Sequence, residues 1–204
     1  MRSLKLWLPP EPVLRTRSRV PAVAGSDATV LPIELLTLLG MGGAAAALAT
    51  LVHFRLGIPG HQIVYAIFPM GLGLALVPRR RAGAVMGVGA LAAVILLRAG
   101  GAVVGAGALT SLLATGPLLD LALRIGGRGR TLYLAFVAAG FLSNVLAFVV
   151  RGAVKAGGVG GLAGGRPLGS WLSEAFLTYP LAGLLAGALS AATWFHVRGS
   201  PASD

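Results

Sequence analysis

The chain has 204 residues, of which 56% are hydrophobic and 11% are charged, and it contains no cysteine. A soluble domain of this length cannot bury so much apolar surface, and the mean hydropathy is +0.84. The composition therefore predicts an integral membrane protein and excludes disulfides, thiolate metal sites and cysteine nucleophiles. The net charge of +11 does not point to nucleic acid, because most basic residues beyond the N-terminal segment lie between apolar stretches and favour anionic headgroups.

The first 30 residues differ from the rest of the chain. They contain five Lys or Arg residues and four prolines, which interrupt any long helix. We expect a basic, proline-rich cytoplasmic arm over residues 1–30, a transmembrane domain over 31–198 and a short tail over 199–204.

Six apolar stretches follow the arm. Pro32 suits a first helical turn, and Glu34 lies in that turn near the positive end of the helix dipole. The second stretch has only sixteen residues and carries Pro69 in its middle, so it reaches about 24 Å and is expected to be kinked or re-entrant. Trp171 and Trp194, at the two ends of the last stretch, are expected to anchor it at the membrane interfaces. The predicted spans are 31–52, 63–78, 82–97, 102–123, 131–150 and 171–197, with a Gly-rich loop over 151–170.

The distribution of Lys and Arg orients these spans. With the N-terminus in the cytoplasm, twelve of the 17 basic residues lie inside and five lie outside. The positive-inside rule then predicts that both termini are cytoplasmic and that the number of spans is even. The expected fold class is an all-α integral membrane protein, a bundle of about six transmembrane helices that crosses the inner (plasma) membrane.

Glycine occurs 31 times, and small residues recur at four-residue spacing within the spans. Such residues let helix backbones approach closely, either inside the bundle or against another membrane subunit. On the first span they predict a partner-docking face formed by Gly43, Ala45, Ala47 and Ala49.

Polar side chains gather at the outer end of the predicted bundle. The first outer connector contains a turn at Pro59-Gly60, and we expect it to fold over a pocket, because ionisable groups at the edge of hydrocarbon are costly unless they are paired, hydrated or bound. Residues of the fifth and sixth spans would complete the site, although Ser143 and Asn144 could instead form hydrogen bonds between helices. The candidate ligand-binding residues are His53, Arg55, His61, Gln62, Asn144 and Glu174.

Two kinds of ligand fit these side chains. His53 and His61 could hold a metal ion, since imidazole suits nickel and zinc, but their separation of eight residues is not a regular ligand spacing. A small organic molecule bound by hydrogen bonds and by Arg55 is the alternative.

Catalysis and ATP hydrolysis have no support in the sequence. The motifs H-E-x-x-H, G-x-S-x-G and G-x-x-x-x-G-K-[ST] are absent. Asp120 and Arg124 form an i,i+4 pair that is expected to be structural or to contact a cytoplasmic partner. We therefore expect neither an enzyme nor a resident cofactor.

Three sequence features carry a resemblance to a known family. They are the segment Gly42–Ala49 with its Ala45/Ala49 spacing, the turn Ile58-Pro59-Gly60-His61, and the segment Arg79–Gly83 that leads into a glycine-rich span. With six spans, these features resemble the substrate-binding S-components of energy-coupling factor (ECF) transporters. Metal-type members carry histidine as their second residue, where this chain has Arg2.

The resemblance implies a specific function. Such a protein captures a vitamin-like small molecule or a metal ion from outside under a first outer loop that caps the substrate. It then docks through its first helices on a transmembrane T-component driven by two cytoplasmic ATPases.

Two other functions remain open. A non-transporting scaffold or assembly subunit needs no pocket, whereas a small stand-alone transporter would show an inverted repeat with interrupted helices in matching positions, which is not evident. The position of the connector 53–62 relative to the fifth and sixth spans distinguishes a binding protein from a scaffold.

Overall fold

The computed structural model describes residues 31–52, 59–127, 129–158 and 167–199, and every regular element in these ranges is an α-helix. The helices are α2 (Pro32–Leu51), α3 (Gln62–Leu76), α4 (Ala82–Ala99), α5 (Ala106–Ile125), α6 (Arg130–Ala156) and α8 (Leu168–Gly199). Five of these six helices are long and apolar enough to cross a membrane, and α3 is a shorter apolar helix. The prediction of an all-α, multi-pass membrane protein is confirmed, while the direction of the termini stays a prediction.

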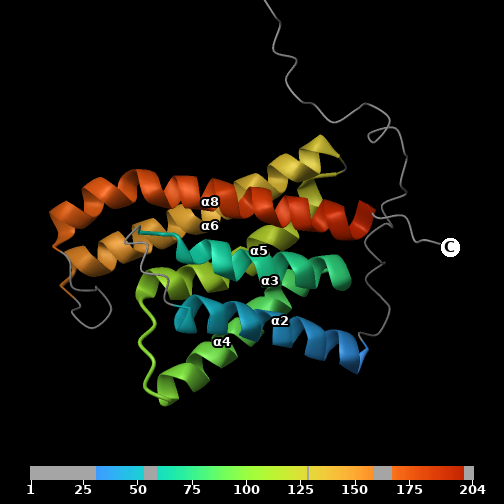
Figure 1. Ribbon diagram of the computed structural model, residues 1–204, viewed down its shortest axis with the longest axis horizontal. Helices are drawn as coiled ribbons and strands as arrows, with labels where there is room; N and C mark the ends of the chain where they lie inside the picture. The colour runs from blue at the N-terminus through green and yellow to red at the C-terminus, as the bar shows by residue number, and fades with distance from the viewer. Residues whose placement is uncertain (1–30, 53–58, 128, 159–166, 200–204) are drawn as a thin grey trace, which may run out of the picture.

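The helices form a ring in an order that differs from their order in the chain. Going around it, α2 packs against α4, α4 against α5, α5 against α6, α6 against α8, α8 against α3, and α3 against α2. The short helix α3 also reaches across the ring to α5, and nine of its 15 residues are buried. Figure 1 shows α3 between the α2–α4 pair and the group formed by α5, α6 and α8. Helix α3 therefore contacts helices on both sides of the ring.

Small residues fill most contacts between helices, while large apolar side chains cover the outside. A Cβ atom on either Gly83 or Gly116 would overlap the carbonyl oxygen of the other, so α4 and α5 touch through their backbones there. On the outer surface, Leu36, Leu96 and Phe176 are 66%, 73% and 65% exposed. This exposure fits a ring of helices whose surroundings are lipid rather than water.

Two helix boundaries differ from the predicted ones by four residues or more. Helix α5 begins at Ala106 rather than at residue 102, because Gly101 turns the chain with φ +89° and the carbonyl of Val104 accepts a hydrogen bond from Arg98 Nη2 at 2.8 Å. Helix α6 continues to Ala156, through part of the predicted loop. Arginine and lysine are good helix formers, so the charges at the end of the span do not stop the helix.

Candidate functional site

The turn that precedes α3 is held against α6 and α8. Gly60 has φ +85°, a conformation that favours glycine, and a Cβ atom there would lie 2.8 Å from Cγ of Tyr179. The amide Nδ2 of Asn144 in α6 donates to the carbonyl oxygen of Gly60 at 3.2 Å and to that of Tyr179 in α8 at 2.7 Å. One buried amide therefore joins the turn to both helices.

This turn lies far from the ends of the two helices that hold it. Asn144 precedes the last residue of α6 by twelve positions, and Tyr179 follows the first residue of α8 by eleven. At about 1.5 Å per residue, both helices continue about 17 Å beyond the turn. Figure 1 shows the pair of helices projecting past the start of α3. We call residues 145–156 and 168–178 the α6–α8 extension.

The two helices of the extension are joined by an aromatic cluster. Trp171 is 2% exposed, stacks on Phe148 with ring centroids 5.5 Å apart, and meets Tyr179 edge-on at 6.1 Å. Both Arg151 and Lys155 lie over the indole of Trp171, with the guanidinium carbon at 5.9 Å and the ammonium nitrogen at 5.8 Å from the ring centroid. The extension thus combines apolar packing with two positive charges.

Arg151 also contacts the residue that anchors the turn. Its Nη1 donates to the hydroxyl oxygen of Tyr179 at 3.2 Å. Gly107 at the start of α5 leaves room for this pair, since a Cβ atom there would lie 3.2 Å from Arg151 Cδ and 3.3 Å from Tyr179 Oη. Tyr179 is therefore shared between Arg151, through its hydroxyl, and Asn144, through its backbone.

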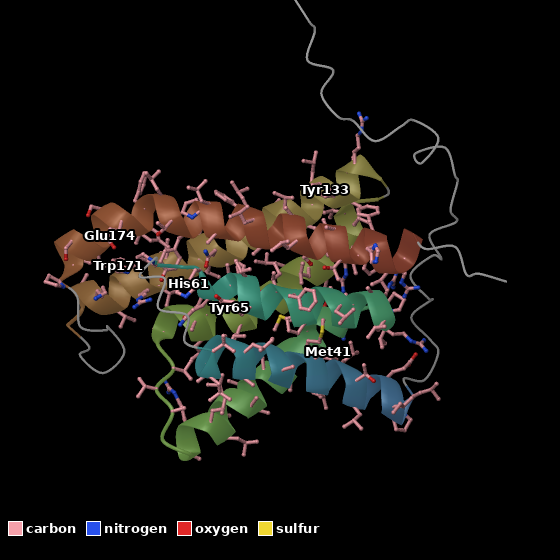
Figure 2. The ribbon with its side chains drawn as sticks, in the orientation of Figure 1. Met41, His61, Tyr65, Tyr133, Trp171 and Glu174 are labelled. Atoms are coloured by element: carbon pink, nitrogen blue, oxygen red, sulfur yellow. The ribbon has the colours of Figure 1, made fainter. Side chains whose placement is uncertain are left out.

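The predicted ligand residues occupy different surroundings. His61 is half-buried beside Tyr65, with the two rings perpendicular and their centroids 6.0 Å apart, while Gln62 and Glu174 are exposed. Figure 2 shows His61 at the start of α3, and Trp171 with Glu174 near the first residues of α8. His53 and Arg55 lie outside the described residues, so their part in the site stays a prediction.

Asn144 and its neighbour Ser143 form the hydrogen bonds between helices that the sequence offered as one alternative. Asn144 is 1% exposed, and its amide nitrogen is used by two backbone carbonyls. Ser143 shares a 2.7 Å hydrogen bond with Thr115 of α5 and donates to the carbonyl of Ser111 at 3.3 Å. Asn144 thus positions the turn, and direct contact with a ligand stays a prediction.

A metal site would need several ligand side chains close together. Within the part of the chain that the structure describes, no three His, Cys, Asp or Glu residues come together in this way. Since His53 lies outside that part, the metal alternative rests on the sequence alone.

The predicted docking face on α2 lies partly inside the bundle. Ala45 and Ala49 are 0% and 6% exposed, because they pack inside the protein's own bundle. Gly43 and Ala47 are half-buried, and a Cβ atom on Gly43 would lie 3.8 Å from that of Ala93 in α4. Two of the four residues thus pack against the protein's own helices, and the contact of this face with a partner stays a prediction.

The predicted interfacial anchors are also buried. Trp194 is 3% exposed and packs on Phe136 with ring centroids 5.8 Å apart, as Trp171 does on Phe148. One indole lies toward each end of α8, as the sequence suggests, but both face neighbouring helices. Cations lie over the faces of both indoles, and the guanidinium carbon of Arg198 is 5.7 Å from the centroid of the Trp194 ring.

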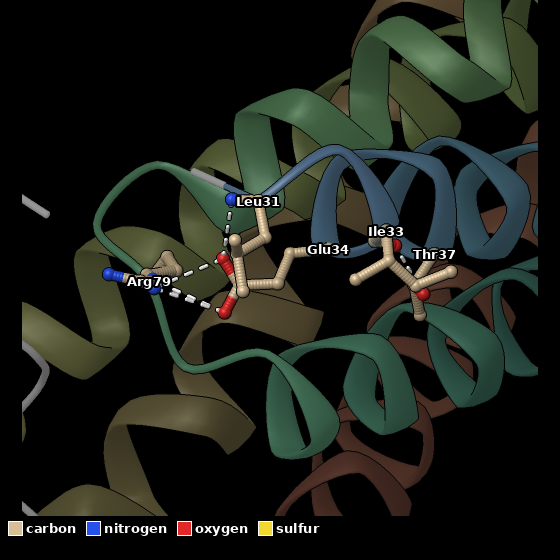
Figure 3. Close-up of polar contacts among 5 residues, drawn as sticks. All are labelled: Leu31, Ile33, Glu34, Thr37 and Arg79. Atoms are coloured by element: carbon tan, nitrogen blue, oxygen red, sulfur yellow. Dashed lines mark hydrogen bonds and ion pairs between the residues drawn. The ribbon is translucent and has the colours of Figure 1, made fainter. Parts of the chain in front are cut away.

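At the opposite end of the bundle, an ion pair joins α2 to the turn after α3 (Figure 3). Arg79 Nη2 lies 3.1 Å from both carboxylate oxygens of Glu34, and the Leu31 N–H donates to Glu34 Oε2 at 3.2 Å. Glu34 therefore binds the start of its own helix, as expected, and also ties that helix to a second segment.

Asp120 holds the start of α4 in place. Its Oδ1 accepts the Gly83 N–H at 2.8 Å and its Oδ2 accepts the Ala84 N–H at 2.9 Å. A carboxylate at a helix N-terminus satisfies free N–H groups and complements the helix dipole. The structural role expected for Asp120 agrees with this geometry, although its hydrogen bonds go to α4 rather than to Arg124.

The contact between Arg151 and Tyr179 was not predicted from the sequence. Their separation of 28 positions gives no local signal. A detectable signal was the i,i+4 spacing of Arg151 and Lys155, which puts two like charges on one helix face.

No protein-family model, curated protein or solved structure matches this chain.

Proposed function

We propose that this chain is the substrate-binding membrane subunit of an ECF-type importer. It captures a vitamin-like small molecule or a metal ion from outside, then docks on a transmembrane T-component driven by cytoplasmic ATPases. The observation that supports this function most is the position of the turn 59–61. A connector that caps a ligand must reach the fifth and sixth spans, and this turn contacts Asn144 in α6 and Tyr179 in α8.

The proposed orientation puts this turn on the outer side of the plasma membrane. Arg79, Arg80 and Arg81 follow α3, so they lie at the other end of the bundle from the turn that precedes it. Positive charge of this kind favours the cytoplasmic side. Both termini are then cytoplasmic.

The non-transporting scaffold is the second candidate, and a specific observation favours it. Ala45 and Ala49, the pair on which the resemblance to a docking helix depends, are buried in the protein's own interior. A T-component would therefore have to contact the outer face of α2, where Ala44 and Leu48 are exposed. A scaffold needs neither this contact nor a ligand.

Native mass spectrometry of the purified chain, combined with metal analysis, tests the proposed function. We expect a stoichiometric small molecule or metal in the unaltered protein, and its loss in His61→Ala, because His61 lies directly after the turn and is half-buried beside Tyr65. His196→Ala is the matched control, since His196 lies in the last turn of α8, at the other end of the bundle, and should leave the ligand bound.

One result would reject the site and another would reject the function. A ligand retained equally by both histidine variants would place the site elsewhere. A chain that purifies empty and without T-component or ATPase subunits would reject the proposed function and leave the scaffold as the better account.

A further inference from the structure

We propose that Arg81, where α4 begins, and Arg124, where α5 ends, bind the phosphate of an anionic phospholipid between them. This site lies at the opposite end of the bundle from the turn 59–61, and it does not depend on transport. The argument rests on the contact that brings the two arginines together, on their lack of acidic partners and on their depth in the membrane.

Asp120 fixes where the two arginines lie. Its carboxylate accepts the N–H groups of Gly83 and Ala84 at 2.8 and 2.9 Å, so the first turn of α4 is held against the end of α5. Arg81 precedes Gly83 by two residues, and Arg124 follows Asp120 by four, which is about one helical turn. A short connection joins the other ends of α4 and α5, which pack side by side. Both arginines therefore lie beyond the Asp120 contact, toward the same end of the bundle.

Neither arginine has an acidic partner among the described residues. Both side chains are exposed, and neither forms an ion pair or a side-chain hydrogen bond there. Of the two described acids at this end of the bundle, Asp120 binds the backbone of α4 with both oxygens, and Glu34 pairs with Arg79. Arg80 is exposed as well and adds a third positive charge. The start of α4 and the end of α5 thus present several free N–H donors and an excess of positive charge.

The length of α4 puts this pair of arginines at the headgroup layer. Residues 82–97 carry no charge and are bounded by Arg81 and Arg98. These 16 residues span about 24 Å, slightly less than the hydrocarbon core of about 30 Å. Long basic side chains near the ends of a membrane helix extend to the interface. Arg81 therefore reaches the layer in which the phosphates of a membrane lie.

The surface around the two arginines suits a phospholipid. The guanidinium is a planar fork that binds phosphate through paired hydrogen bonds, and two such forks from different helices can bind one phosphate. Leu121 and Ile125 lie one turn apart on α5, on either side of Arg124 in the sequence, and both are exposed. They offer an apolar surface to the acyl chain of a lipid whose headgroup is bound by Arg124. A soluble phosphate would leave this surface uncovered.

Two measurements on the detergent-purified full chain test this site. In the first, native mass spectrometry measures how much dioleoylphosphatidylglycerol the chain retains, compared with dioleoylglycerol, which has the same acyl chains but no phosphate. In the second, thermal unfolding is followed with added glycerol 3-phosphate, compared with sodium chloride at equal ionic strength. The first measurement detects a headgroup site, and the second shows whether phosphate without acyl chains is sufficient.

Arg81→Gln and Arg124→Gln are the informative variants, and Arg98→Gln is their matched control. Arg98 carries the same charge at the other end of α4, where its guanidinium donates to the Val104 carbonyl at 2.8 Å. Losing a charge-assisted hydrogen bond lowers affinity about tenfold or more. We expect each informative variant to retain about tenfold less phosphatidylglycerol, while Arg98→Gln retains as much as the unaltered chain. The double variant should lose less than the product of the two single losses, because both arginines bind one phosphate.

Each outcome decides the proposal. A preference for phosphatidylglycerol that both informative variants lose supports the site. Equal retention of the two lipids overturns it, as does an equal loss in Arg98→Gln, which would indicate attraction by net charge alone. Stabilisation by glycerol 3-phosphate without a preference for phosphatidylglycerol would reject a lipid ligand. Should Arg81→Gln fail to fold, Arg81→Lys keeps the charge but loses the fork, and lipid retention unaltered by it would also count against the site.

Discussion

The contact between α6 and α8 gives the sharpest test of how this bundle is held together. Gly140 of α6 faces Gly183 and Gly187 of α8, and a Cβ atom at position 140 would lie 2.5 Å from the Gly183 carbonyl oxygen and 2.6 Å from the Gly187 nitrogen. These are backbone atoms, so no flexible side chain can move aside. The variant Gly140→Ala must therefore push the two helices apart.

The size of that displacement follows from the distances. An ordinary contact of a Cβ atom begins at 3.4 Å, so the helices must separate by about 0.9 Å from the 2.5 Å that the glycine leaves. One turn away, the hydrogen bond from Asn144 Nδ2 to the Tyr179 carbonyl is 2.7 Å long. A rigid separation would stretch this bond to about 3.6 Å, which is beyond a hydrogen bond.

The expected cost combines these two effects. Overpacking a core costs about 1–3 kcal/mol, and the loss of an interhelical hydrogen bond adds about 1 kcal/mol. We expect Gly140→Ala to be about 2–4 kcal/mol less stable than a variant that gains the same methyl group without a clash.

Gly152→Ala provides that reference. It lies on the same helix and faces the same partner, but a Cβ atom there would be 3.6 Å from Trp171 Cζ3, an ordinary contact. Both variants gain the same helix propensity, so their difference reports the clash alone. The assay is unfolding in mixed micelles with increasing dodecyl sulfate, followed by circular dichroism. A difference below about 0.5 kcal/mol, the usual range for a neutral substitution, would refute the reasoning.

Two further predictions concern polar and backbone features. Asn144→Leu removes the hydrogen bonds to the carbonyls of Gly60 and Tyr179. The free energy of opening the turn should fall by about 1–2 kcal/mol, so amide hydrogen exchange at residues 60–62 should become faster. Unchanged exchange would show that the turn is held by other contacts. Arg81 has φ +65°, a left-handed conformation that costs a non-glycine residue about 1 kcal/mol, so Arg81→Gly should raise the unfolding midpoint. Arg80→Gly, where φ is not positive, should not, and an equal gain in both would contradict the explanation.

Much of the fold could be predicted because helices that cross lipid need long apolar stretches, which are easily recognised in a sequence. The apolar stretches and the charges between them located the six helices that the structure describes, and the brevity of the second stretch with Pro69 correctly marked α3 as unusual. The end of α6 was misplaced, because Arg151 and Lys155 look like the start of a loop. In the structure they remain helical, with their side chains over Trp171 in α8, a contact between residues distant in sequence.

The site was harder to predict, for a related reason. Spacing shows that Ala45 and Ala49 share one helix face, but it does not show whether that face meets the protein's own helices or a partner. In the same way, the tryptophans could be placed near the ends of α8 but not turned toward the interior. The partner of Asn144 is the Gly60 carbonyl 84 positions earlier in the chain, and no local pattern encodes such a pairing.

The unequal lengths of the helices have a consequence for the surrounding bilayer. Helices α2 and α4 have 20 and 18 residues, whereas α6 and α8 have 27 and 32. The charge-free parts of α6 and α8, residues 131–150 and 175–195, have 20 and 21 residues, so each reaches only about 30 Å, the thickness of the hydrocarbon core. The additional length of the two helices carries Arg151, Lys155 and Glu174 and therefore extends beyond the hydrocarbon. A thicker bilayer would cover these charged residues, so the protein should tilt or thin the bilayer on the α6–α8 side rather than accept a thicker one there.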